Sequence, residues 1–236
     1  MDNTPISRRN LLIKGAALGV AGSTSLGLLA ACAGESNAPT TPDSGTTNEG
    51  AKTVSETTVG TTYDNLLSAI QGETNATTKY MAFAAIAKEE GLEQIARLFE
   101  CTADAEKIHI DLEYKLAKSM DDSTELPTGD TPPEAPSAEN LIAGASGEIY
   151  ETSDMYPKFI EKAEEEGESA AAAVFTRAKL AEGYHAELYM NLFNNIEDLD
   201  EDTYHLCPFC GYIRKGEEDT DNCPICGANP SAFKAY

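Results

Sequence analysis

Glutamates interrupt the apolar side of every long helical segment that this sequence predicts. Helical periodicity of apolar residues runs through four segments: 63–89, 92–118, 139–165 and 168–195. The acidic positions that fall among the expected core residues are Glu73, Glu106, Glu148, Glu151 and Glu182. A carboxylate buried without a partner costs free energy or is forced to become neutral. Five carboxylates facing one core therefore need a shared cation, which a metal cluster would supply.

Two of these glutamates belong to Glu-x-x-His pairs, formed by Glu106 with His109 and by Glu182 with His185. A spacing of three residues places both members of a pair on one helix face. Carboxylate and imidazole ligands without thiolates favour iron or manganese over zinc. A single pair of this kind is common by chance, but two pairs in register with three more glutamates predict a dinuclear site in a helical bundle.

An internal repeat indicates pseudo-twofold symmetry in this bundle. Four residues recur 76 positions later: Gly91, Phe99, Glu106 and His109 return as Gly167, Phe175, Glu182 and His185. Glu73 recurs as Glu148, which is 75 positions later, so the spacing of the repeat is one residue shorter here. A bundle with two symmetry-related halves is well suited to bind two metal ions.

The connections between the segments predict the topology. Gly91 and Gly167 fit short links inside each helix pair, because glycine commonly ends helices. A long stretch rich in Asp, Thr and Pro, residues 120–138, joins the two pairs. Two short links and one long crossover are typical of a ferritin-like four-helix bundle. We therefore expect a mainly α fold, with this bundle over residues 63–197.

The N-terminus predicts an export signal. Arg8 and Arg9 precede a weakly apolar stretch that ends in Leu-Ala-Ala-Cys32, a pattern similar to a twin-arginine signal peptide with a lipoprotein cleavage site. A transmembrane helix fits less well, since the uncharged stretch is shorter than the roughly 20 apolar residues that a span needs. We expect residues 1–32 to be this signal and Cys32 to be lipidated. Residues 33–62, rich in Thr, Ser, Gly and Pro, are expected to be a disordered linker. The protein would then lie on the extracytoplasmic face of the cell membrane.

The charge balance excludes some classes of partner. The chain has 40 acidic and 17 basic residues, which give a formal net charge of −23. Binding to nucleic acid needs a basic surface, and so does adsorption to an anionic membrane by charge. We expect neither, although a lipid on Cys32 would still hold the protein to a bilayer.

Four of the six cysteines form a second candidate metal site near the C-terminus. Cys207 and Cys210 make one Cys-x-x-Cys turn, and Cys223 and Cys226 make another, each followed by glycine. Two such turns predict a tetrahedral four-thiolate site, within a small domain over residues 203–236. Zinc and iron both accept this geometry. Zinc would make the domain structural, whereas iron would make it a one-electron carrier.

Together these motifs resemble rubrerythrin. The matching segments are Gly72-Glu73, the stretch 106–109, the stretch 147–151, Met155-Tyr156-Pro157 and the stretch 182–185, followed by the four-cysteine module. The resemblance implies a di-iron bundle followed by a small, β-rich rubredoxin-like domain with one iron on four thiolates. It also implies a peroxidase that reduces hydrogen peroxide to water in oxidative-stress defence.

The resemblance also implies residue roles. The six ligands implied for the oxidised di-iron site are Glu73, Glu106, Glu148, Glu151, Glu182 and His185. His109 would replace Glu151 on one iron upon reduction, and Glu151 off the metal would act as an acid. Tyr80 and Tyr156 match pocket tyrosines of the family. Its members commonly form head-to-tail homodimers.

The sequence leaves the identity of the electron donor and two alternative functions open. If the protein is exported, its electron donor is expected to be extracytoplasmic or linked to the membrane. A ferroxidase or iron-handling protein that uses oxygen is the alternative enzymatic function. A metal-binding or electron-transfer lipoprotein, with zinc possible on the cysteines, is the non-enzymatic one.

Overall fold

A computed structural model describes residues 57–216 and 221–236. The expected export signal, the lipidation site Cys32 and most of the expected linker lie outside the described residues. The helical elements are α2 (Thr62–Glu89), α3 (Glu93–Met120), α4 (Ser137–Tyr150), the π-helix η1 (Glu151–Met155), α5 (Tyr156–Glu166) and α6 (Ser169–Asn194). In the described part of the chain, no helix is both long and apolar enough to cross a membrane.

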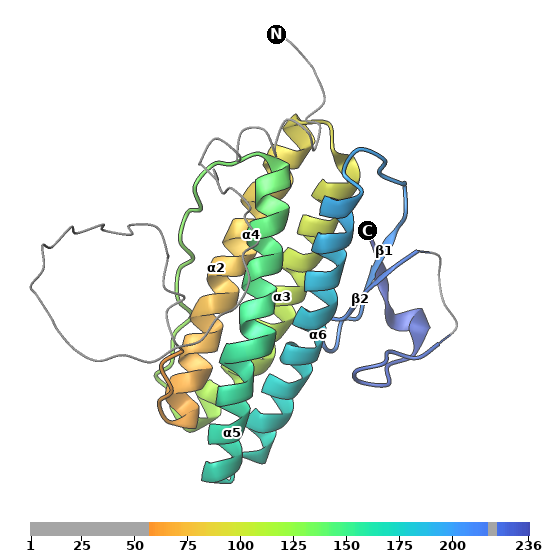
Figure 1. Cartoon of the computed structure of the whole chain (residues 1–236). Coiled ribbons are helices and arrows are strands. Elements are labelled where there is room, and N and C mark those ends of the chain that lie inside the picture. Colours follow the sequence, from red (N-terminus) through yellow and green to blue (C-terminus); the bar gives the residue numbers. More distant parts are fainter. Residues whose placement is uncertain (1–56, 217–220) are drawn as a thin grey trace, which may run out of the picture. The chain divides into compact units, whose positions relative to one another are not determined.

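The four-helix bundle has the predicted connectivity. Helix α2 packs mainly on α3, while α4 and α5 together form the third long helix and pack on α6. Figure 1 shows residues 121–136 running back along the bundle from the end of α3 to the start of α4. Gly91 and Gly167 adopt the positive φ angles, 75° and 78°, that favour glycine in helix-ending turns. The predicted ferritin-like bundle with a long crossover is confirmed.

The described chain begins inside the expected linker. The Thr57 hydroxyl lies 2.7 Å from the Tyr150 hydroxyl, and the Thr57 N–H donates to Asp154 at 3.3 Å. Helix α2 then starts at Thr62, because Thr61 and Asp64 form a reciprocal capping box. The last residues of the expected linker are therefore held against the bundle by hydrogen bonds that composition alone does not reveal.

The π-helix explains the slip of one residue in the internal repeat. The interval from Glu148 to Gly167 is one residue longer than the interval from Glu73 to Gly91. A π-helical turn accommodates such an extra residue without ending the helix. Beyond η1 the repeat regains its spacing of 76, so that Tyr156 becomes the symmetry mate of Tyr80.

Two apolar clusters fill the bundle. One contains the fully buried ring of Phe99, whose centroid lies 5.9 Å from that of Tyr80 and 5.1 Å from that of Tyr189. The other contains Phe175, whose centroid lies 5.9 Å from that of Tyr156. Each cluster thus includes a tyrosine that reaches the buried polar residues described below.

The C-terminal residues form a small antiparallel sheet. Strand β1 (Tyr204–Leu206) lies between β2 (Ile213–Lys215) and β3 (Lys234–Ala235), and a short 3₁₀ helix, η2 (Pro230–Ala232), precedes β3. Strands β1 and β2 contact α3, and β2 also contacts α6. The Lys234 ammonium group lies 2.9 Å from the Asp104 carboxylate on α3. The predicted small β-rich module is confirmed.

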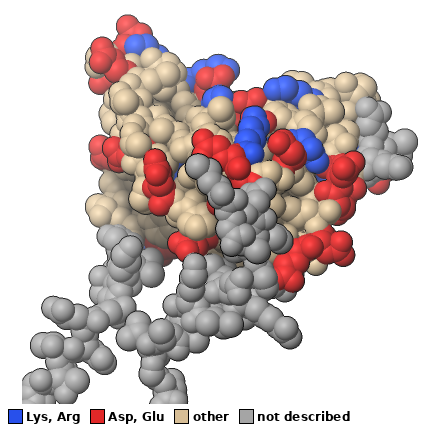
Figure 2. Space-filling view, turned by 90° about the horizontal axis from the view of Figure 1, so that it is seen from above, with Lys and Arg blue, Asp and Glu red and all other residues tan. Residues whose placement is uncertain are grey.

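Acidic and basic side chains are interspersed on the face of the molecule in Figure 2. Surface ion pairs include Lys107 with Asp104 at 2.8 Å and Lys215 with Asp200 at 2.7 Å. Exposed pairs of this kind contribute little to stability. The buried charges of the bundle are the stronger indication of function.

Candidate metal centres

The two Glu-x-x-His pairs meet inside the bundle. The rings of His109 and His185 lie with centroids 6.2 Å apart and planes 25° apart, and both side chains are buried. Two groups of four residues bring potential ligand atoms within 4.8 Å of one another. The first group is Glu73, Glu106, His109 and Glu182, and the second is Glu106, Glu148, Glu182 and His185. Because they share two glutamates, the groups suit two neighbouring ions with bridging carboxylates.

Backbone carbonyls of the first cysteine turn fix both imidazole rings. His109 Nε2 lies 3.1 Å from the Cys210 carbonyl oxygen, and His185 Nε2 lies 2.8 Å from the Gly211 carbonyl oxygen. A carbonyl oxygen only accepts hydrogen bonds, so each Nε2 carries a hydrogen and donates it. In the neutral ring Nδ1 is then the free ligand atom, which is how metal-binding histidines are commonly oriented.

The buried polar atoms fit a pair of metal ions. His109 Nδ1 lies 2.8 Å from Glu182 Oε1, and His185 Nδ1 lies 2.7 Å from Glu182 Oε2. With neutral rings and no cation, the lone pairs of these nitrogens would face the lone pairs of the carboxylate oxygens. The ligand-group atoms with no hydrogen-bond partner in the described structure are Glu73 Oε2, Glu106 Oε1, Glu148 Oε2, both Glu182 oxygens and His185 Nδ1. Buried polar atoms are rarely left unsatisfied. Metal ions bound at these atoms would satisfy them.

The electrostatics of the protein without metal support this interpretation. Burial, with the charges of Glu106 and Glu182, raises the pKa of Glu148 to about 8. Burial opposes ionisation of Glu182, but the two histidines lower its pKa to about 2. Burial would lower the pKa of His109, yet Glu182 raises it well above its usual value. Without metal, protons must therefore neutralise charges that cations would otherwise balance.

Glu151 lies outside both ligand groups. It is the first residue of η1 and is 9% exposed. Burial, followed by the charge of Glu148, raises its pKa well above the usual value. In this structure His109 belongs to the first ligand group, and Glu151 belongs to neither group. This is the arrangement that the resemblance implies for reduced iron. The exchange between these two residues stays a prediction.

Both predicted tyrosines hold carboxylates of the site. The buried Tyr80 hydroxyl donates to Glu148, and the buried Tyr156 hydroxyl donates to Glu73. These contacts cross the bundle and follow its pseudo-twofold symmetry. Each tyrosine therefore restrains one carboxylate that belongs to a single ligand group.

Glu113 is a buried residue near the site that our sequence analysis missed. It lies on α3, is 0% exposed, and its Oε1 is 2.9 Å from the Tyr156 hydroxyl. The signal was available, because Glu106, His109 and Glu113 are spaced i, i+3 and i+7 along one helix face.

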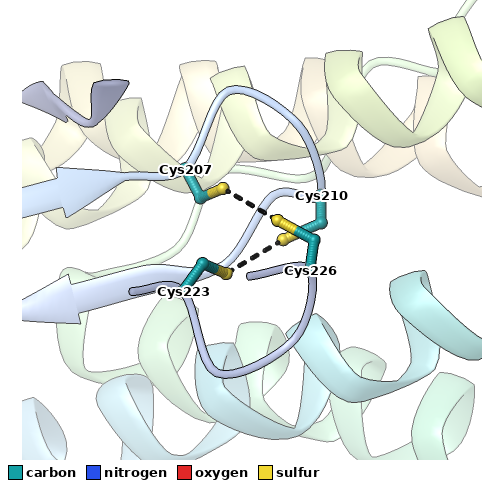
Figure 3. Close-up of side chains that lie close together, drawn as sticks. All are labelled: Cys207, Cys210, Cys223 and Cys226. Carbon is teal, nitrogen blue, oxygen red and sulfur yellow. Dashed lines mark hydrogen bonds between the residues drawn. The ribbon is translucent and has the colours of Figure 1, made fainter. Parts of the chain in front are cut away.

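The four C-terminal cysteines converge as predicted. Figure 3 shows their sulfur atoms pointing toward one another, with Cys207 Sγ 3.6 Å from Cys226 Sγ and Cys210 Sγ 3.5 Å from Cys223 Sγ. Tetrahedral metal–sulfur bonds of about 2.3 Å would hold sulfurs roughly 3.8 Å apart. None of the described cysteines forms a disulfide. The hydrogen bond between Cys210 and Cys207 lowers the pKa of Cys207 and raises the pKa of Cys210, so without metal the group holds protons that a metal would displace.

Matches to protein families cover both parts of the described chain. The family described as "Rubrerythrin" matches residues 64–193, and "Rubrerythrin, rubredoxin-like domain" matches residues 205–234. The chain is 58% identical over 182 residues to nigerythrin of Nitratidesulfovibrio vulgaris, an alignment that covers 77% of this chain and 90% of that protein. It is 37% identical to a rubrerythrin of Porphyromonas gingivalis, with 73% of this chain and 88% of that protein covered.

A solved structure agrees with these matches. The fully reduced, all-ferrous state of nigerythrin superposes with a TM-score of 0.75 at 57% identity, over 78% of this chain and 91% of that one. The predicted di-iron site in the ferritin-like domain and the predicted rubredoxin-like four-cysteine site are thereby confirmed. The chain belongs to the rubrerythrin family, whose members are iron-dependent oxidoreductases.

Proposed function

We propose that this protein reduces hydrogen peroxide to water at the di-iron site, with electrons delivered through iron in the four-cysteine site, in defence against oxidative stress. The observation that carries the proposal is the pair of hydrogen bonds from the di-iron site histidines to the carbonyls of Cys210 and Gly211. The four-cysteine site and the di-iron site are thereby in direct contact, as an electron relay requires. The family assignment supports the same chemistry.

Reduction of one peroxide molecule to two waters consumes two electrons and two protons. When bound, two ferrous ions would each supply one electron, which breaks the O–O bond without releasing a radical. The chain supplies the environment. Tyr80 and Tyr156 hold Glu148 and Glu73 in place, and burial excludes bulk water. Glu151 lies outside both ligand groups, and its raised pKa suits it to deliver a proton to the departing hydroxide.

The electron path needs few atoms. Cys210 supplies both a thiolate of the four-cysteine site and the carbonyl that accepts from His109. The route therefore runs from sulfur through one residue's backbone and one hydrogen bond to an imidazole ligand. At the outer side of the same site, Phe209 is 56% exposed and Cys226 is partly exposed, which leaves room for an electron donor to approach.

The relay is tested by substituting one thiolate ligand. Cys207→Ser should leave a di-iron site that peroxide oxidises once, but catalytic turnover should stop because electrons no longer arrive. Stopped-flow absorption separates the single oxidation from turnover. Cys101→Ser, which removes a buried thiol of α3 outside the four-cysteine group, is the matched control and should keep turning over. Sustained turnover of the Cys207 variant, with a reductant that delivers to the four-cysteine site, would eliminate the relay.

The ferroxidase alternative makes a different kinetic prediction. A ferroxidase would use oxygen to oxidise the diferrous site, whereas a peroxidase should react much faster with peroxide. Zinc in the cysteine site would also end the relay. Metal analysis with a visible spectrum decides this point, because oxidised iron on four thiolates is coloured and zinc is not.

We also propose export and membrane anchoring through residues 1–32 and Cys32, with an extracytoplasmic or membrane-linked donor. Fractionation of cells should find the protein with the membrane, and Cys32→Ala should release it from that fraction. Recovery of the unaltered protein from the cytoplasm would reject the proposal. A homodimer is expected from family resemblance, although the histidine–carbonyl contacts need only one chain.

A further inference from the structure

Glu113 is a buried acid that neither ligand group contains. It lies one helical turn beyond His109 on α3 and is 0% exposed. Its Oε1 contacts the Tyr156 hydroxyl at 2.9 Å, and its Oε2 has no hydrogen-bond partner in the described structure. Within residues 57–216 and 221–236, no lysine or arginine forms an ion pair with it. An ionised Glu113 would be a buried negative charge with no lysine or arginine partner, which is costly.

The number of available protons also argues for a neutral Glu113. The Tyr156 hydroxyl lies between two carboxyl groups, those of Glu73 and Glu113. A hydroxyl has one proton and donates one full hydrogen bond. One of the two contacts therefore needs a proton on a carboxyl group. Glu73 belongs to a metal-ligand group and must ionise to bind metal, so the proton belongs on Glu113.

Glu113 also breaks the pseudo-twofold symmetry of the bundle. Tyr80 contacts Glu148 as Tyr156 contacts Glu73. The symmetry mate of Glu113 is Tyr189, whose ring packs against that of Tyr80 with centroids 5.5 Å apart. Among the described residues, a second carboxyl group therefore contacts the tyrosine hydroxyl only in the half of the site that contains His109.

We propose that Glu113 is a neutral carboxylic acid that positions the metal ligand Glu73 through Tyr156. Glu113 donates to the Tyr156 oxygen, which commits the Tyr156 proton to Glu73 Oε1. Glu73 Oε2, which has no hydrogen-bond partner, is then left for the metal. Burial raises the pKa of Glu113 to about 8, which agrees with a neutral acid near pH 7. The inference concerns iron binding and does not depend on which oxidant the protein uses.

Two substitutions separate this role from simple packing. Glu113→Gln keeps the shape and a hydrogen-bond donor, whereas Glu113→Leu removes the donor. Loss of an outer-shell partner typically weakens metal binding about 10- to 100-fold. We expect that loss for one of the two ferrous ions in Glu113→Leu and in Tyr156→Phe, measured by competition with a chelator. Glu113→Gln should bind both ions nearly as the unaltered protein does.

Two further variants complete the affinity test. The double variant Glu113→Leu/Tyr156→Phe should be no weaker than the weaker single variant, because both residues act through one chain of hydrogen bonds. Tyr189→Phe, at the symmetry-related position, is the matched control and should bind both ions normally.

Infrared spectra of the iron-loaded protein give a second measurement that does not depend on activity. A band from a protonated carboxyl group should appear near neutral pH, shift in heavy water, and vanish in Glu113→Gln. In Tyr156→Phe the band should remain at a changed frequency. If Glu113→Leu does not fold, the comparison of the unaltered protein with Glu113→Gln still decides whether the band comes from a protonated Glu113. Absence of the band, or iron binding in Glu113→Gln as weak as in Tyr156→Phe, would overturn the proposal.

Discussion

Gly211 is a point of close approach between the four-cysteine domain and the di-iron site. Its φ of +76° favours glycine, and its carbonyl accepts from His185 at 2.8 Å. A Cβ atom at this position would lie 2.3 Å from His109 Nε2 and 3.0 Å from its Cε1. Gly211→Ala therefore cannot keep the cysteine turn seated on the two histidines.

The cost follows from these contacts. Ordinary van der Waals contact begins at 3.4 Å, so the turn or the imidazole must retreat by about 1 Å. That movement disrupts two hydrogen bonds worth about 0.5–1.5 kcal/mol each. The left-handed backbone adds about 1–2 kcal/mol of strain for a residue with a Cβ, but this strain is present whether or not the turn is docked. Docking of the turn should weaken by about 1–3 kcal/mol, which corresponds to roughly fivefold or more.

The assay compares a single oxidation with sustained turnover. Gly211→Ala should still be oxidised once by peroxide, whereas turnover through the four-cysteine iron should fall about fivefold or more, as docking weakens. Gly227→Ala is the matched control, because Gly227 has nearly the same φ, +75°, and among the described residues no atom beyond its chain neighbours lies within 4 Å of the added Cβ. If both variants turn over at the same rate, the contact with His109 does not serve electron delivery.

Two further predictions concern stability. Metal-free protein should lose unfolding free energy as the pH rises from about 5 to 8, by on the order of a few kcal/mol. Glu113 and Glu148 have folded-state pKa values of about 8 against an ordinary 4.5, so the folded state holds protons that the unfolded state has released. Urea unfolding across that range measures the slope, which should be smaller with iron bound, and a slope of opposite sign would contradict the assignment. Phe99→Ala should lower the unfolding free energy of the iron-loaded protein by about 3–5 kcal/mol, because it empties a fully buried position packed against Tyr80 and Tyr189. A loss below 1 kcal/mol in chemical unfolding would show that the core collapses to fill the space.

Much of the bundle was predictable because its sequence breaks a strong physical rule. Charged residues on the apolar side of a helix need partners, and two Glu-x-x-His pairs at equal spacing, with Glu73 and Glu148, gave both halves of the site. The cysteine turns were equally specific, since thiolate geometry depends on local spacing.

Other features depend on tertiary placement and could not be predicted. The seating of Cys210 and Gly211 on the two histidines joins segments about 26 and 101 residues apart, and no local pattern encodes it. The π-helix was visible only as a slip of one residue between Glu73 and Glu148. Glu113 shares a helix face with Glu106 and His109, but it was missed because a lone glutamate one turn past a histidine usually faces solvent, and packing shows that this one does not.

Reduction of peroxide at the di-iron site is the reaction that we propose for this protein. The most direct test mixes the fully reduced, iron-loaded protein anaerobically with hydrogen peroxide and, separately, with oxygen, and follows the oxidation by stopped-flow absorption. We predict that one equivalent of peroxide oxidises one di-iron site, much faster than oxygen does. Equal or faster oxidation by oxygen, or a diferrous site that does not react with peroxide, would contradict the account.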